Sequence, residues 1–133
     1  MKQYLLDTNI VAFLLRGRKE VIDNIIKIGI DNCHISEMTY GELLYGVFCS
    51  ANPSKNAEML KAFMDGIDTI PLKEVWPTFA KSKFGLRKIG KLVDDADIII
   101  GDTAITYDMI MVTENTKHFE NLPGIMLENW IRR

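Results

Sequence analysis

Three acidic residues lie far apart in this chain, and each stands where an apolar segment ends or turns. Asp7 follows a short apolar run, Glu42 lies in a stretch of helical character, and Asp97 opens the run Ile98-Ile99-Ile100. A carboxylate beside so much apolar sequence is costly to bury unless it is paired or holds a cation. Three converging carboxylates would repel one another, and a hard divalent metal ion is the simplest agent to hold them together. The acids therefore predict a metal-dependent hydrolase acting on phosphodiesters.

Length and composition set the limits of the prediction. The chain has 133 residues, which predicts a single domain over 1–133 with room for a substantial core. No apolar run approaches the roughly 20 residues that span a bilayer, and the apolar stretch at the N-terminus is too short for a signal peptide. We therefore expect a cytoplasmic protein in which Cys33 and Cys49 are reduced thiols.

Charge is balanced overall but uneven along the chain. The formal net charge of −2 argues against a surface coated with basic residues for nucleic acid. Residues 79–91 nevertheless carry five Lys and Arg residues and no acid, and such a cluster can contact phosphates. Within it, Lys83 and Arg87 are candidate RNA contacts. The alternative is that this segment is simply the solvated face of a helix.

Apolar periodicity predicts strands that alternate with helices. This alternation favours an α/β fold with a central, mainly parallel sheet flanked by helices on both faces. Two middle helices, ending near Gly66 and Gly90, look like an antiparallel pair inserted between two halves of the core. The expected strands cover 2–6, 32–35, 109–112 and 125–127, with 69–72 as a short connecting strand at best.

Sites in parallel sheets form outside the carboxyl ends of the strands. Asp7 and Asn115 both follow predicted strands, and Asp97 can begin a helix that faces the same crevice. Glu42 has a structural alternative, because Thr39 precedes it by three residues and the two could form a capping box.

Four ordered blocks resemble the motifs of PIN-domain ribonucleases, especially the VapC toxins of bacterial toxin–antitoxin pairs. The blocks are Leu5-Leu6-Asp7-Thr8-Asn9, the segment from Tyr40 to Gly46, Asp97 to Gly101, and Val112 to Phe119. The resemblance covers essentially the whole chain. It implies a PIN-like fold and an endoribonuclease dependent on Mg²⁺ or Mn²⁺. The residues it implies for the site are the metal ligands Asp7, Glu42 and Asp97, the catalytic-site residue Asn115, and the supporting hydroxyls of Thr8 and Thr113.

The chain departs from the family pattern at two positions. His118 stands where many relatives have an Asp, which puts a tightly held second metal in doubt and makes His118 a candidate phosphate contact. Asp102 stands where small residues are commoner. On a helix it lies about 140° around from Asp97, so it should not bind the same ion and is expected to be solvated or to support the site from outside. Asp94 and Asp95 are expected to be exposed or capping, and His34 to be structural.

The resemblance also implies a mechanism and partners. A metal-activated water would attack the phosphate in line and leave a 3′-hydroxyl, with structured RNAs such as tRNA as substrates. The partners implied are a small VapB-like antitoxin that covers the acidic site, often with an arginine, and a second copy in a homodimer. DNA would be bound only through the antitoxin, and no membrane is involved. We expect Arg132 and Arg133 to be a solvated tail.

Two other functions remain open from sequence. The chain could be a catalytically weak PIN-fold module that acts through a partner or a DNA complex, because a fold does not guarantee an activity. It could also be an Asp-based phosphatase with Asp7 as nucleophile, although Asp7-Thr8-Asn9 lacks the second Asp which that chemistry usually requires. A nuclease assay with and without EDTA distinguishes the first of these from the endoribonuclease.

Overall fold

The centre of the fold is a five-stranded sheet in which all neighbouring strands run parallel. The computed structural model describes all 133 residues. The strand order is β3-β2-β1-β4-β5, so β1 lies in the middle and the chain leaves it first toward β2 and later toward β4. The strands are β1 (Tyr4–Leu6), β2 (Cys33–Ser36), β3 (Asp68–Ile70), β4 (Ile110–Val112) and β5 (Leu127–Glu128). This confirms the predicted α/β fold with a parallel sheet.

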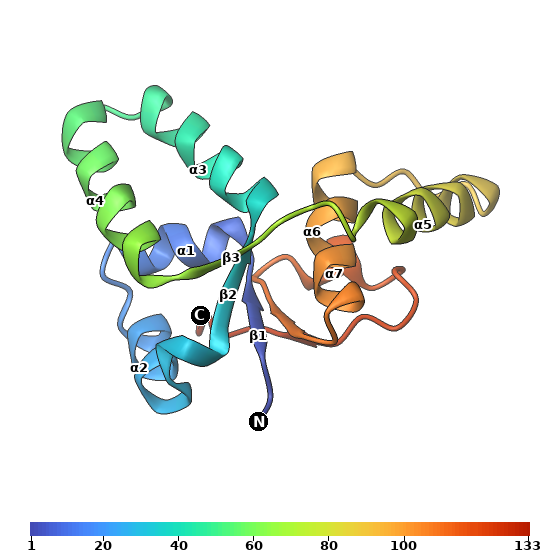
Figure 1. Cartoon of the computed structure of the whole chain (residues 1–133), viewed down its shortest axis with the longest axis horizontal. Helices are drawn as coiled ribbons and strands as arrows, with labels where there is room; N and C mark the ends of the chain where they lie inside the picture. The colour runs from blue at the N-terminus through green and yellow to red at the C-terminus, as the bar shows by residue number, and fades with distance from the viewer.

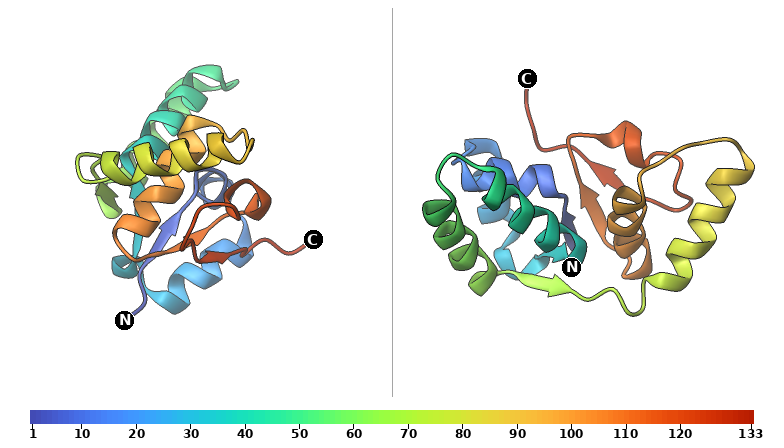
Figure 2. Two further views of the ribbon diagram at one scale, coloured as in Figure 1. Left: turned by 90° about the vertical axis from the view of Figure 1, so that its right-hand side faces the viewer. Right: turned by 90° about the horizontal axis from the view of Figure 1, so that it is seen from above.

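Helices cover both faces of the sheet, and the order of the elements follows the predicted alternation (Figures 1 and 2). The first four helices lie on one side and the last three on the other, as the two ends of Figure 1 show. No helix is both long enough and apolar enough to cross a bilayer. The helices are α1 (Thr8–Leu15), α2 (Lys19–Ile28), α3 (Glu37–Cys49), α4 (Pro53–Gly66), α5 (Trp76–Lys88), α6 (Asp95–Thr106) and α7 (Thr116–Phe119), with a 3₁₀ turn at Ile30–Asn32.

Alternation along the strands divides the core into two clusters. Leu6 and Val112 belong to the cluster under the first four helices, whereas Leu5 and Met111 belong to the cluster under α5, α6 and α7. Successive side chains of a strand point to opposite faces of the sheet, so neighbouring residues pack into different core clusters. All four side chains are fully buried, which fixes the register of β1 against β4 and with it the position of the residue after each strand.

The predicted antiparallel pairing of the two middle helices is wrong. α4 packs against α3, and α5 packs against α6 on the other side of the molecule (Figure 1). The reason is β3, which is an edge strand paired with β2 rather than a mere connection. The segment from α4 to α5 therefore crosses the sheet edge and separates the two helices.

Local sequence explains where the helices begin. The Ser36 hydroxyl accepts a 3.1 Å hydrogen bond from the N–H of Met38, so Ser36 is the N-cap of α3, as predicted. α6 starts at Asp95, two residues earlier than expected. Asp97 thus lies in the first turn of α6, where the helix dipole favours a negative charge.

α6 approaches α7 closely at Gly101. A Cβ at this position would lie 2.4 Å from Cδ1 of Leu122 and 3.2 Å from the ring of Phe119. Both side chains are buried. Glycine at 101 therefore lets α6, which carries Asp97, sit against the segment that follows β4.

Candidate active site

Asp7 stands at the point where the strand order reverses. Its N–H donates to the Val112 carbonyl over 2.9 Å, which joins the carboxyl ends of β1 and β4. Its Oδ1 accepts from the Thr8 N–H at 2.8 Å, so Asp7 is also the N-cap of α1. Its Oδ2 accepts from the Thr113 hydroxyl at 2.7 Å. Sites of open parallel sheets form at such a crevice.

The Asp7 carboxyl is held in a poorly solvated position. Asp7 is only 5% exposed. Burial raises the pKa of Asp7 to about 6; hydrogen bonds from Thr113 and Thr8 oppose that rise, and the negative charges of Asp97 and Glu42 add to it. Glu42 and Asp97 thus lie near enough to Asp7 for their charges to act on its carboxyl.

Thr8 connects Glu42 to Asp7, because it forms hydrogen bonds with both carboxylates. The Thr8 hydroxyl donates to Oε1 of Glu42 over 2.5 Å and lies 3.2 Å from the hydroxyl of Thr39. Because α3 begins at Glu37 with Ser36 as its cap, Glu42 is well inside the helix and the capping-box alternative is wrong. Thr39, which is fully buried, is a member of this network that the sequence reasoning did not assign to the site.

Asp97 approaches from the opposite side, on α6. Its Oδ2 lies 3.4 Å from Nδ1 of His118 on α7. Burial, as the main cause, and the charge of Asp94 raise the pKa of Asp97, while His118 lowers it. His118 thus touches a candidate metal ligand, in addition to being a candidate phosphate contact.

The three acids do not form a preformed cage. No group of three or more His, Cys, Asp or Glu side chains lies close enough together to hold a metal ion. The donor set nevertheless fits a hard divalent cation in its chemistry, because all three candidates offer carboxylate oxygens. A cation would also relieve the repulsion that Asp97 and Glu42 exert on Asp7.

Two hollows open beside these acids. A groove of about 270 Å³ runs between α1, α3 and α4 and is lined by Thr8, Glu42 and apolar side chains such as Leu43. A second hollow of about 350 Å³ is lined by Asp97, Lys91, Lys117, His118 and neighbours. One hollow is thus largely apolar and leads to Glu42, and the other carries cationic groups and leads to Asp97.

The turn after β4 supports Asp7 and presents Asn115. The Asn115 N–H donates to the Thr113 hydroxyl oxygen at 3.0 Å, and its own side chain is exposed and makes no hydrogen bond. The Glu114 N–H donates to Oδ1 of Asn9 at 3.4 Å. Asn9 and Glu114 were not predicted as site residues, although Asn9 belongs to the motif around Asp7.

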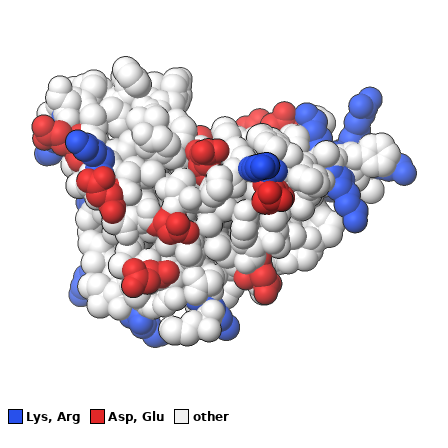
Figure 3. All heavy atoms as spheres, viewed as in Figure 1, with Lys and Arg blue, Asp and Glu red and all other residues white.

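Several other predicted residues lie outside the site. Lys83 forms an exposed ion pair with Asp95 at 3.0 Å, and Arg87 is exposed in the last turn of α5. The basic side chains of α5 gather at one end of the molecule, on the right of Figure 3. His34 lies between Asp68 and Gln3, at 2.6 Å from each, and is structural as expected.

Asp102 is fully buried, so the expectation of a solvated side chain is wrong, while the alternative that it supports the site from outside stays a prediction. Its Oδ1 accepts a 3.0 Å hydrogen bond from the Ser82 hydroxyl of α5, and its Oδ2 has no partner. Burial raises the pKa of Asp102 to about 6, and the bond from Ser82 opposes this rise. Asp102 faces α5 because five residues of helix turn it away from the side of α6 that carries Asp97.

The family profile described as PIN domain matches residues 4–125. The chain belongs to the PIN-domain family, so the resemblance found in the sequence is confirmed.

Among its relatives, ribonuclease VapC2 of Haemophilus influenzae is 30% identical over 98% of this chain and 100% of that protein. The tRNA(fMet)-specific endonuclease VapC of Shigella flexneri is 28% identical over 98% of this chain and 99% of that protein. The solved structure of DNA-bound VapBC from Salmonella typhimurium contains a chain with a TM-score of 0.91 and 25% identity, covering 98% of this chain and 100% of that chain.

Proposed function

We propose that this chain is a metal-dependent endoribonuclease, the toxin of a VapBC-type pair, and that it hydrolyses RNA phosphodiesters, with tRNA as the substrate class. The observation that carries the proposal is the Asp7 carboxylate, which is buried at the strand-order switch, held by Thr8 and Thr113, and repelled by Glu42 and Asp97. Relatives named as VapC ribonucleases, one of them specific for a tRNA, support the substrate class.

The chain's own residues would prepare the cation site. Asp7, Glu42 and Asp97 would hold Mg²⁺ or Mn²⁺, while Thr113 and Thr8 keep the Asp7 oxygens in place. When bound, the cation would stabilise charge on the phosphate and make a water molecule more acidic. With a pKa of about 6, Asp7 is largely anionic at pH 7.5, which is the form that can hold a cation.

The RNA backbone would approach from the side of Asp97. Lys91, Lys117 and His118 line the hollow beside this acid, and Lys/Arg groups supply most of the affinity for phosphates. Arg87, in the last turn of α5, lies outside this hollow and would offer a further phosphate contact. Asn115, which is exposed at the edge of the turn that supports Asp7, would contact the substrate.

The largely apolar groove between α1, α3 and α4 fits a segment of the antitoxin. Its lining joins apolar side chains to Thr8 and Glu42, so an occupant with an apolar face and a basic residue would cover the site. Binding of DNA would come through this partner, as the DNA-bound VapBC structure of Salmonella typhimurium suggests. The homodimer implied by the resemblance and the cytoplasmic location expected from the sequence stay predictions.

The direct test is cleavage of tRNA by the purified chain. We expect cleavage with Mg²⁺ or Mn²⁺, none with EDTA, and products with a 3′-hydroxyl that accept poly(A) polymerase extension without prior phosphatase treatment. Addition of the cognate antitoxin should stop the reaction. Undiminished cleavage in EDTA would refute metal dependence, whereas no cleavage of any RNA would favour the alternative of a binding module that acts through its partner.

A further inference from the structure

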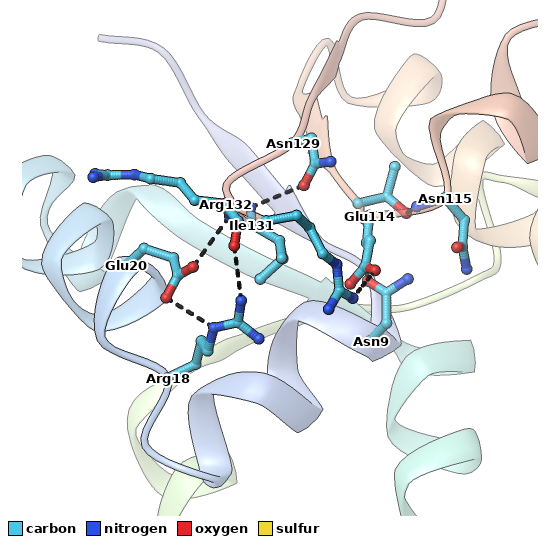
Figure 4. Close-up of polar contacts among 10 residues, drawn as sticks. Asn9, Arg18, Glu20, Glu114, Asn115, Asn129, Ile131 and Arg132 are labelled. Atoms are coloured by element: carbon cyan, nitrogen blue, oxygen red, sulfur yellow. Dashed lines mark hydrogen bonds and ion pairs between the residues drawn. The ribbon is translucent and has the colours of Figure 1, made fainter.

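The segment Asn129–Arg133 is bound to the body of the protein, although its last residues were expected to be a solvated tail. The Arg132 N–H donates to Oε2 of Glu20 at 3.1 Å, and the Arg132 carbonyl accepts from Arg18 at 3.0 Å. Arg18 and Glu20 are themselves paired at 2.9 Å. Figure 4 shows these contacts converging on the backbone of Arg132. The backbone just before Arg133 is therefore fixed to the start of α2.

From this fixed backbone, the side chain of Arg133 extends to the turn after β4. Its guanidinium donates to the Glu114 carboxylate. The Glu114 side chain is only 24% exposed, and the guanidinium is its one side-chain partner. Arg132 behaves differently: its contacts are made by its backbone, and its side chain points away from Glu114 in Figure 4.

Glu114 stands between two residues of the candidate active site. Thr113 on one side donates to Asp7, and the Asn115 N–H on the other donates back to Thr113. The Glu114 N–H is bound by Asn9, two residues after Asp7. Every residue of the turn 113–115 thus takes part in at least one hydrogen bond, and the Glu114 side chain joins the turn to Arg133.

We infer that Arg133 is a positioning residue of the candidate active site, which holds the turn 113–115 in the orientation that supports Asp7 and presents Asn115. An exposed ion pair contributes little to global stability. Its effect here is instead on geometry, since the anchored Arg132 backbone fixes the point from which the guanidinium reaches. The effect on catalysis rests on the proposed function, whereas the effect on the turn does not.

The test compares Arg133→Gln with Arg132→Gln, which removes the same charge one residue away. The first readout is hydrogen exchange of the Glu114 and Asn115 amides in metal-free protein. We expect several-fold faster exchange in Arg133→Gln and in Glu114→Gln, and wild-type exchange in Arg132→Gln and in Arg133→Lys, since lysine can still pair with Glu114.

The second readout is steady-state RNA cleavage. Arg133→Gln should lower kcat roughly tenfold, the low end of what partners of metal ligands contribute, with KM nearly unchanged. Arg133→Lys should recover most of the loss, and Arg132→Gln should resemble wild type. A rise in KM of equal size in Arg133→Gln and Arg132→Gln would show that charge contributes generally to RNA binding, and it would overturn the inference.

The two readouts separate the inference from the proposed function. Equal amide exchange in Arg133→Gln and wild type would overturn the positioning role, whatever the activity. Faster exchange in a chain that cleaves no RNA under any condition would support the positioning of the turn and count against the proposed function alone.

Discussion

The Thr113 hydroxyl donates a 2.7 Å hydrogen bond to Oδ2 of Asp7, across 106 residues of sequence. The two residues follow β4 and β1, which are neighbours in the sheet. The bond ties the carboxyl ends of the two strands together at the switch in strand order. It also lowers the pKa of Asp7 against the larger effect of burial, so it favours the anionic form of the carboxyl, which burial disfavours.

Removing this hydroxyl should impair catalysis more than folding. Thr113→Val keeps the shape of the side chain but leaves Oδ2 of Asp7 with one donor fewer. We expect kcat for RNA cleavage to fall roughly tenfold or more, and Thr113→Ser, which restores the hydroxyl, to recover most of it. Wild-type kcat in Thr113→Val at neutral pH would show that this bond does not serve the site.

Asp102 should make stability depend on pH. The pKa of Asp102 is raised to about 6 in the folded protein, against about 3.9 in an unfolded chain. The folded state therefore binds the proton more tightly, and this contribution is present below pH 4 and lost as pH rises through 6.

We predict that Asp102→Asn raises the free energy of unfolding by about 1–2 kcal/mol at pH 8, because a buried charge is removed. The gain should vanish near pH 4. Chemical denaturation at both pH values measures it, with the exposed Asp23→Asn on α2 as a control that should show no such dependence. A gain of equal size at both pH values would contradict the assignment to a titrating carboxyl.

Gly101 should tolerate no side chain. Its Cβ would meet Leu122 at 2.4 Å and Phe119 at 3.2 Å, so Gly101→Ala should destabilise the fold by about 1–3 kcal/mol. Gly85→Ala in α5, where a Cβ meets nothing within 4 Å, should instead stabilise it by roughly 0.5–1 kcal/mol through helix propensity. Thermal unfolding of the two variants tests the contrast, and a melting temperature for Gly101→Ala at or above that of wild type would contradict the close approach of α6 to this segment.

Basic residues beside Asp97 and at the end of α5 should bind the RNA backbone. Lys117→Gln and Arg87→Gln should each weaken binding of RNA and reduce the slope of log affinity against log salt by about 0.7 for each lost phosphate contact. Measurement in EDTA keeps the RNA intact, and Lys61→Gln on the exposed side of α4 is the matched control. Lys83 is already paired with Asp95, so its replacement should change the slope less. If the slope of log affinity against log salt stays at the wild-type value in both variants, these residues only keep the surface solvated and do not contact RNA.

Much of the fold could be predicted because its signals are local. The Ser36 cap of α3 and the buried strands that end at Asp7 and before Thr113 follow from residue types within a few positions. The carboxyl-end rule then brings Asp7 and Asn115 to one edge of the sheet. The separation of α4 and α5 could not be predicted because β3, Asp68-Thr69-Ile70, contains only one buried apolar residue, and its pairing with β2 rather than its own sequence makes it a strand.

The remainder of the site depends on long-range contacts that no local pattern encodes. Nothing in the local sequence marks Thr39 as a site residue; it joins the site because Thr8 of α1 contacts its hydroxyl. The Arg133–Glu114 ion pair joins residues far apart in the sequence, next to the point where Glu20 of α2 binds the backbone of Arg132. Asp102 was placed on the correct side of α6, away from Asp97, but its burial depends on α5 packing there.

Mn²⁺-dependent cleavage of tRNA by Asp7→Asn, Asp97→Asn and Asp102→Asn tests the central claim most directly. All three variants replace an acid by its neutral isostere, and two of them lie five residues apart on one helix. We expect Asp7→Asn and Asp97→Asn to lose at least 100-fold in kcat/KM, while Asp102→Asn stays within about threefold of wild type, since only the first two would hold the cation. Cleavage at the wild-type rate by folded Asp7→Asn and Asp97→Asn would contradict a cation site built from these carboxylates.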